Sequence, residues 1–176
     1  MTYKFLASGG VGPFSRRAWP LPLGHTPGAW VEAEGPLELC ARGVHVCRTI
    51  DLAHWLHEEL WQVEADGDQL EGLDCIVVRR ARLLRRIDAW TDGGAARFAD
   101  ACIAHAAMLA GSDLDAAIRQ FLDDAKDAAS AGYLAVSAFC ATLAVSKLVP
   151  SGERESAFRR ERAWQGSWIT TELIAS

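Results

Sequence analysis

The densest group of reactive side chains in this 176-residue chain lies between positions 40 and 57 and comprises Cys40, His45, Cys47, His54 and His57. In an extended segment alternate side chains point to opposite faces, so His45 and Cys47 share one face and the valines beside them share the other. An imidazole beside a thiol can serve as a general base next to a nucleophile. We therefore treat His45 and Cys47 as candidate catalytic residues.

The segment 60–65 adds a carboxylate to this group. Its residues alternate, with Trp61 and Val63 on one side and Gln62 and Glu64 on the other. If this strand lies near 43–47, Glu64 can face His45, orient its tautomer and raise its pKa, which makes Glu64 a third candidate catalytic residue. The alternative is that Glu64 is an ordinary solvent-facing side chain on a half-exposed sheet.

A metal site is the second interpretation of the same cluster, with Cys40, His45 and Cys47 as ligands. Structural zinc sites usually show two close ligand pairs separated by a loop, and the spacing Cys-x4-His-x-Cys lacks that pattern. The sequence therefore predicts no metal, and a Cys/His metalloprotein is kept as an alternative. Cys47 can equally pack as a small apolar side chain.

Two of the seven tryptophans lie in the first 36 residues, which are rich in proline and glycine. A rigid amphipathic ring suits ligand stacking, so we expect Trp19 and Trp30 at the mouth of a pocket, as candidate cofactor-binding or ligand-binding residues. The alternative is that they pack beneath a long loop.

The elements that must position these side chains follow from hydrophobic periodicity. Short apolar runs bounded by Gly, Pro and Asp predict strands at 3–6, 30–33, 43–47, 60–65 and 75–80. Thr49 is a candidate N-cap for one short helix over 50–59. Five arginines between positions 79 and 86 can bind an anion or pair with the many acidic side chains, and we favour the pairing.

Beyond Trp90 the period becomes helical. We expect helices at 94–110, from Ser112 to 131–132, at 133–148 and at 153–173, with Ser112 and Asp115 forming a capping box. His105 and Glu161 fall on helix faces that look buried, and we expect a satisfied core histidine and an ion pair with a neighbouring arginine.

Strands followed by helices indicate an α+β fold. We expect an N-terminal antiparallel or mixed sheet with one short helix over 1–90, followed by about four C-terminal helices over 91–176 that pack on it as one compact unit.

Composition excludes several classes of protein. Half of the residues are hydrophobic and 23% are charged, which excludes a disordered chain, and the net charge of -5 argues against a duplex-DNA binder. No apolar run reaches the roughly 18 residues of a membrane helix, and no signal-peptide pattern is present. Five dispersed cysteines fit a reducing compartment.

These features predict a cytoplasmic protein whose partner is a small molecule. No membrane or nucleic-acid partner is expected. A protein partner can bind through the helical half.

Part of the chain resembles a family of short, uncharacterised bacterial and phage proteins. The resemblance rests on Trp30-Val31-Glu32, Gly35-Pro36-Leu37, Cys40 and Gly43-Val44-His45-Val46-Cys47, and it continues through Glu161-Arg162-Ala163-Trp164-Gln165. This family implies no mechanism.

The layout from Gly43 onward is also similar to the NAD-binding core of ADP-ribosyltransferases. In that family a Gly-apolar-Tyr-aromatic strand precedes a helix and a further strand, and here Gly43-Val44-His45-Val46 precedes an expected helix and the segment 60–67. The resemblance implies that His45 occupies the position of the tyrosine that stacks on nicotinamide.

Three functional hypotheses follow. The first is a transferase-like enzyme with a degenerate ADP-ribosyltransferase-like core that binds a small ligand such as a nucleotide, with His45 as acid or base. The second is a non-enzymatic binding or protein-interaction module, and the third is the metalloprotein. The sequence assigns no cofactor, substrate or reaction.

Overall fold

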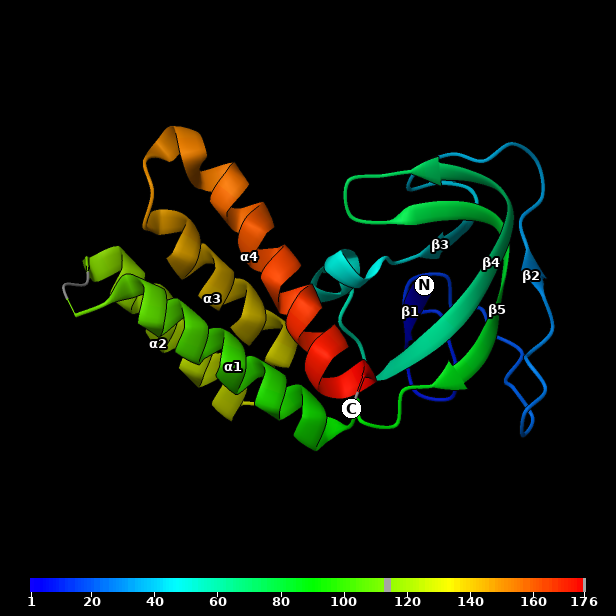
Figure 1. Cartoon of the computed structure of the whole chain (residues 1–176), viewed down its shortest axis with the longest axis horizontal. Helices are drawn as coiled ribbons and strands as arrows, with labels where there is room; N and C mark the ends of the chain where they lie inside the picture. The colour runs from blue at the N-terminus through cyan, green and yellow to red at the C-terminus, as the bar shows by residue number, and fades with distance from the viewer. Residues whose placement is uncertain (113–114, 176) are drawn as a thin grey trace. The chain divides into compact units, whose positions relative to one another are not determined.

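The computed structural model describes residues 1–112 and 115–175 and confirms the α+β fold, with the strands N-terminal and the helices C-terminal (Figure 1). The chain divides into two compact units, Met1–Thr91 and Asp92–Ser176. The first unit is the sheet and the second is a helical bundle.

The sheet is antiparallel throughout. Its strands are β1 (Thr2–Leu6), β2 (Val31–Glu32), β3 (Val44–Val46), β4 (Glu59–Glu71) and β5 (Ile76–Arg86). They pair in the order β1-β4-β5-β2, and β3 also pairs with β5. Just past the end of β3, Cys47 exchanges two main-chain hydrogen bonds of 2.9 and 2.8 Å with Tyr3 of β1. The sheet therefore curls until its first strand meets the end of β3.

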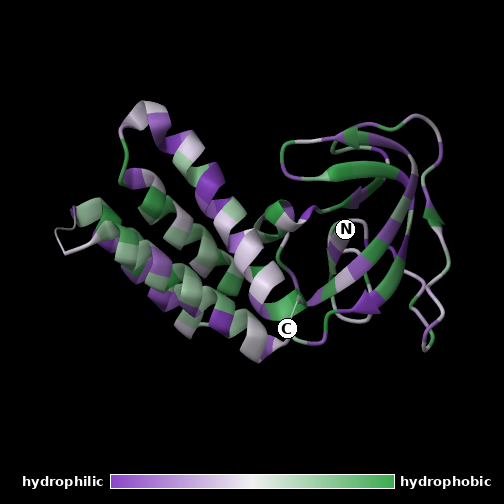
Figure 2. Ribbon diagram, viewed as in Figure 1, coloured by the Kyte–Doolittle hydropathy of each residue, from purple (hydrophilic) through white to green (hydrophobic). Residues whose placement is uncertain are grey.

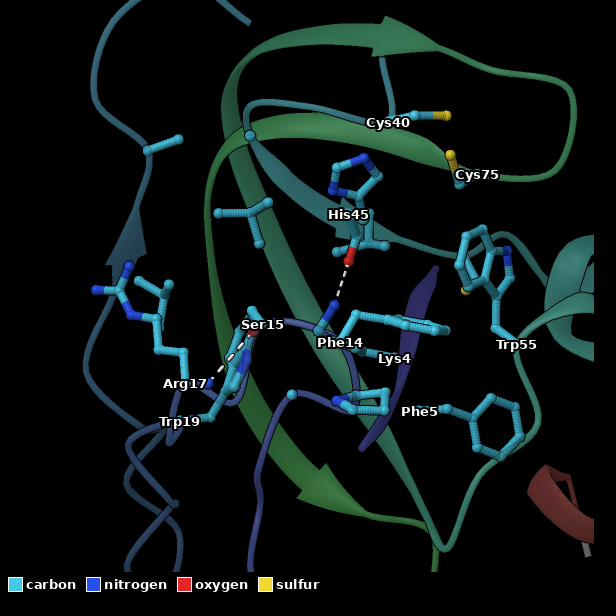
Figure 3. Close-up of a pocket in the computed structure, with 18 of the residues that line it drawn as sticks. Lys4, Phe5, Phe14, Ser15, Arg17, Trp19, Cys40, His45, Trp55 and Cys75 are labelled. Atoms are coloured by element: carbon cyan, nitrogen blue, oxygen red, sulfur yellow. Dashed lines mark hydrogen bonds between the residues drawn. The ribbon is translucent and has the colours of Figure 1, made fainter. Parts of the chain in front are cut away.

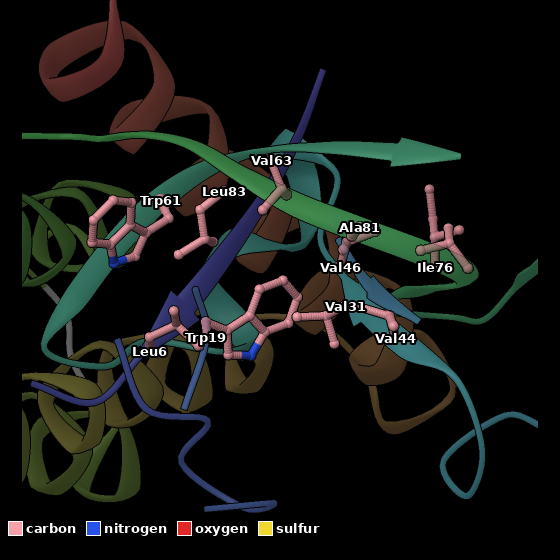
Figure 4. Close-up of a cluster of buried hydrophobic side chains, with 11 residues drawn as sticks. Leu6, Trp19, Val31, Val44, Val46, Trp61, Val63, Ile76, Ala81 and Leu83 are labelled. Carbon is pink, nitrogen blue, oxygen red and sulfur yellow. The ribbon is translucent and has the colours of Figure 1, made fainter. Parts of the chain in front are cut away.

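Alternation along the strands separates a core face from a charged face, and Figure 2 shows hydrophobic and hydrophilic residues alternating along the long strands. The core includes Val44 and Val46, as the alternation predicts, and Trp19 from the N-terminal loop (Figure 4). On the charged face Arg80 pairs with Asp66 at 2.5 Å and Arg82 pairs with Glu64 at 2.8 Å. Four of the five arginines between 79 and 86 therefore pair with acidic side chains, as expected, and Arg85 donates a hydrogen bond to the Gln62 amide oxygen.

The predicted helix over 50–59 is shorter than expected. A single 3-10 helix, η1, covers Thr49–His54, and its N-cap is Arg48 instead of Thr49. The Asp51 side chain accepts hydrogen bonds from the main-chain N–H and the guanidinium of Arg48, which starts the helix at that point. The helix cannot continue to 59 because Glu59 pairs with Leu6 as the first residue of β4.

The helical unit contains α1 (Asp92–Ala110), α2 (Ala116–Ser130), α3 (Leu134–Lys147) and α4 (Arg154–Ile169). A short 3-10 turn, η2 (Ser151–Glu153), precedes α4, and a π-helical turn, η3 (Thr170–Ile174), follows it. None of the helices in the described part of the chain has the length and apolar character needed to cross a membrane.

The start of α2 corrects the predicted capping box. Asp115 itself is the N-cap, because its carboxylate accepts a hydrogen bond of 2.9 Å from the main-chain N–H of Ala117, so Ser112 does not cap the helix. The predicted stop at 131–132 is confirmed. Gly132 follows α2 at a φ of +80°, and Tyr133 donates its N–H back to Ala128.

Candidate functional site

A pocket of about 450 Å³ opens in the sheet unit beside β1 and β3 (Figure 3). Its wall is mostly apolar and aromatic, with a few polar groups, as small-molecule sites commonly are. The side chains that carry its chemistry are Lys4, Phe14, Arg17, Trp19, His45, Cys47 and Trp55. All of them belong to the unit Met1–Thr91.

Three of the five predicted site residues meet at this pocket. Trp19, His45 and Cys47 line it, and they come from the N-terminal loop, from β3 and from the residue after β3. Gly43 makes the approach of β3 possible, because it has a φ of +137° and a Cβ there would collide with the side chain of Val77. Glu64 and Trp30 are not among the lining residues.

The predicted contact between Glu64 and His45 is not formed. Glu64 lies opposite Arg82 on β5, and its carboxylate accepts a hydrogen bond of 2.8 Å from that guanidinium. His45 lies opposite Val77, farther along the same strand. At the rise of a β-strand the two positions on β5 are about 16 Å apart, so the carboxylate cannot orient the imidazole.

Trp30 faces arginines instead of the pocket. The guanidinium carbons of Arg80 and Arg82 lie 4.7 and 4.6 Å from the centroid of its ring. These are cation–π distances. The ring therefore packs against the charged face of the sheet, and it does not lie at the mouth of this pocket.

Lys4 is a pocket residue that the sequence analysis missed. Its ammonium nitrogen donates a hydrogen bond of 2.6 Å to the main-chain oxygen of His45 and lies 5.2 Å from the centroid of the Trp19 ring. Within residues 1–112 and 115–175 no carboxylate pairs with it, although Glu32 lines the same pocket. In the sequence, the one feature that could have pointed to Lys4 is its charge, because it is the single charged residue inside the apolar segment 3–6.

The surroundings of Lys4 shift its protonation equilibrium toward the neutral amine. Burial among apolar side chains lowers the pKa of Lys4 below its ordinary value of 10.5, and the nearby thiols of Cys47 and Cys75 oppose that shift only in part. Lys4 is thus a hydrogen-bond donor that has no carboxylate partner within the described residues.

His45 is a half-buried residue whose Nε2 atom has no hydrogen-bond partner within the described residues. Burial lowers the pKa of His45 below 6.5, Lys4 lowers it further, and a hydrogen bond with the main chain of Gly43 acts in the opposite direction. At neutral pH the imidazole is therefore uncharged. Figure 3 shows its ring on the side of Cys40, whereas its main-chain oxygen faces Lys4.

Cys47 is a protonated thiol at neutral pH. Burial raises its pKa to about 12, despite the opposing charge of Lys4. Since the thiolate is the nucleophilic form, the structure gives Cys47 the properties of a packing residue instead of an activated nucleophile.

The five cysteines should therefore differ in reactivity. Cys40 is exposed, Cys140 is partly exposed, and Cys47, Cys75 and Cys102 are buried. We expect a thiol-disulfide reagent at pH 7.5 to modify Cys40 first in the native protein and to modify the buried three only after unfolding. Peptide mapping after a short exposure checks this order, and early modification of Cys47 would mean that the pocket is wider than described.

The loop that forms one wall of the pocket is held by Glu59, a buried carboxylate at the start of β4. Glu59 accepts hydrogen bonds of 3.0 Å from the N–H of Gly9, 3.1 Å from the N–H of Gly10 and 2.9 Å from the indole of Trp61. Gly10 in turn accepts the N–H of Trp19 at 2.9 Å. Glu59 thus fixes the loop that brings Trp19 to the pocket.

The structure offers no ligand set for the metalloprotein hypothesis. Among the residues that it describes, no group of three or more His, Cys, Asp or Glu side chains is arranged so that it could hold a metal ion. In the pocket, Cys40, His45 and Cys47 all contribute to the wall without forming such a group.

The helical unit contains a second polar cluster. The His105 ring lies 3.1 Å from the carboxylate of Glu161 and stacks on Trp164, with the ring centroids 3.7 Å apart. Glu161 is buried, and burial raises its pKa while His105 acts in the opposite direction. His105 is therefore a satisfied histidine, as expected. Glu161 interacts with this histidine and, electrostatically, with the neighbouring Arg162.

Comparison of the chain with protein-family models, with curated proteins and with solved structures finds no match. The resemblance to the ADP-ribosyltransferase core therefore stays a prediction, and a functional proposal has to rest on the geometry of the pocket.

Proposed function

We propose that the sheet unit binds a small, planar ligand in this pocket, that a polar oxygen of the ligand faces the Lys4 amine, and that His45 acts on the ligand as an acid or base. The protein would then be a small-molecule enzyme, with nucleotides among its candidate ligands.

The observation that carries this proposal is the unneutralised amine of Lys4. A desolvated amine without a carboxylate partner costs stability, and such groups are concentrated at functional sites. Its one hydrogen bond within the described residues goes to a main-chain oxygen, so an ammonium at this position has two further N–H groups to donate.

The walls of the pocket support a planar ligand. Phe14 and Trp55 meet edge to face, with ring centroids 6.3 Å apart, and Trp19 lies beside Lys4. A volume of about 450 Å³ falls within the range of small-molecule sites. Arg17 adds a second cation at the wall, which favours a ligand that carries negative charge.

His45 supplies the chemical part of the proposal. A neutral imidazole can take or give one proton, and the half-buried His45 lines the pocket. If His45 only holds the ligand, the protein is the non-enzymatic binding module. A protein partner of the helical half remains a separate prediction.

Thermal unfolding with AMP, NAD, nicotinamide and benzoate as probes tests the proposal. A ligand at a hundred times its dissociation constant stabilises the protein by about 2.7 kcal/mol, and we expect at least one probe to do so. Phe14, which is 83% exposed, can be replaced by alanine without disturbing the core. Phe14→Ala should weaken binding, whereas Leu23→Ala, 85% exposed and outside the pocket wall, should not.

A turnover measurement distinguishes the enzyme from the non-enzymatic binding module. Incubation of the bound probe with the protein, followed by mass spectrometry, shows whether the probe is converted. We expect conversion to be lost in His45→Ala while binding is kept. If no probe binds, or if both exposed-residue variants bind as the wild type does, the pocket is not the site.

A further inference from the structure

Lys4 differs in its surroundings from another lysine of the same chain. The sequence contains three lysines, at positions 4, 126 and 147. Lys126 is exposed on α2 and pairs with Asp123 at 2.9 Å. Lys4 lies in an apolar pocket, and its hydrogen-bond acceptor is the main-chain oxygen of His45.

The position of the Lys4 nitrogen is fixed by the sheet. Lys4 lies opposite Trp61 in the β1–β4 register, and the preceding residue, Tyr3, exchanges two hydrogen bonds with Cys47 on the other side. The backbone of Lys4 is thus held from both directions. One N–H of the side chain is anchored on His45. Burial makes the neutral form of the amine more accessible, and that form carries the lone pair that reacts.

We propose that Lys4 forms an imine with an aldehyde or ketone group of the pocket ligand. The nitrogen lone pair attacks the carbonyl carbon, the C–N bond forms, and the carbonyl electron pair moves to oxygen, which takes a proton from nitrogen. The resulting carbinolamine loses its hydroxyl group and the second N–H proton as water, and the C=N bond forms. Amine and carbonyl give imine and water, with no oxidation or reduction.

The pocket suits this reaction because its apolar walls favour the uncharged amine, which is the form that attacks a carbonyl. This inference rests on the proposed function, because it names the chemical class of the ligand that the same pocket would take.

Two carbonyl probes test the inference on the full chain at pH 7, each with sodium cyanoborohydride to trap the imine. Formaldehyde is small enough to reach any open amine, and 4-carboxybenzaldehyde is a planar anion of the kind the pocket should accept. Because burial lowers the pKa of Lys4, a larger fraction of its amine is neutral at pH 7, and we expect Lys4 to be modified several-fold faster than Lys126 by both probes. Peptide mapping measures the rates at all three lysines.

Matched variants define the outcomes. Lys4→Arg should remove the fast reaction, Lys126→Arg should leave it unchanged, and benzoate should slow it by occupying the pocket. Equal rates at Lys4 and Lys126 would overturn the inference. If benzoate binds in a Phe14-dependent manner while Lys4 stays unmodified, the imine is wrong and the proposed ligand site stands; if neither occurs, both fail.

Discussion

The Lys4→Met variant is expected to bind the pocket ligand about 10- to 100-fold more weakly than the wild type and yet to be more stable. A hydrogen bond to a charged group contributes about 1.5–3 kcal/mol, and this corresponds to the expected loss of affinity. Methionine has a similar length and fills the same apolar space without the desolvated amine. We expect a gain in stability of about 1 kcal/mol, which raises the melting temperature by about 2–4 °C.

The pH dependence of the free energy of unfolding is a second test of the prediction that Lys4 destabilises the folded protein. The pKa of Lys4 in the folded state lies below 10.5, so the unfolded chain binds more protons in the window between the lowered value and 10.5. Stability therefore rises with pH through that window. Lys4→Met should lose this contribution to the slope, whereas Lys126→Met should keep it.

Titration calorimetry with the best probe and thermal scans between pH 7 and 10 check both parts. Lys126→Met is the matched control, since it removes an exposed lysine of the other unit. Unchanged affinity together with lower stability in Lys4→Met would show that the lysine is a structural residue.

Glu59→Ala is expected to destabilise the sheet unit by about 4 kcal/mol and to abolish ligand binding. The substitution leaves two main-chain N–H groups and the indole N–H of Trp61 without their acceptor. Each buried donor left unsatisfied costs about 1–3 kcal/mol. Because the same carboxylate holds Gly9 and Gly10, the loop that brings Trp19 to the pocket loses its anchor.

Glu58→Ala is the matched control for this variant. Glu58 is the preceding residue, it is exposed, and its carboxylate accepts a hydrogen bond from the N–H of Ser8. We expect Glu58→Ala to change stability by less than about 1 kcal/mol. Urea unfolding followed by tryptophan fluorescence measures both variants, because five of the seven tryptophans belong to the sheet unit. Equal losses in the two variants would contradict the role given to Glu59.

Periodicity predicted the class of fold because strand and helix patterns are local properties of the sequence. The valines beside His45 alternate with polar residues, and the alternation correctly placed them in the core. The hydrophobic pattern predicted strands at 60–65 and 75–80, and it did not predict that β4 continues to Glu71 and β5 to Arg86 through polar residues. Residues 66–71 stay extended because β5 supplies their main-chain hydrogen bonds, across a register shift between Asp66 and Gln69.

The candidate site was predicted only in part, for a similar reason. His45 and Cys47 are close in sequence, so alternation could relate them, whereas Glu64 could be placed near His45 only by assuming a strand neighbour. The true neighbour of β3 in the sheet is β5, and Glu64 pairs with Arg82 instead. Lys4 lies at the site because the neighbouring residue, Tyr3, forms a β-bridge with Cys47. This contact joins residues far apart in the sequence, so no local sequence pattern could predict it.

The most direct test of the central claim is an NMR titration of protein labelled with ¹³C at the lysine ε carbons, in which three signals are expected. We expect the signal that is lost in Lys4→Met to titrate below the ordinary lysine value of 10.5 and to shift when a pocket probe is added. A Lys4 signal that titrates at the ordinary value and is unaffected by AMP, NAD, nicotinamide and benzoate would contradict it.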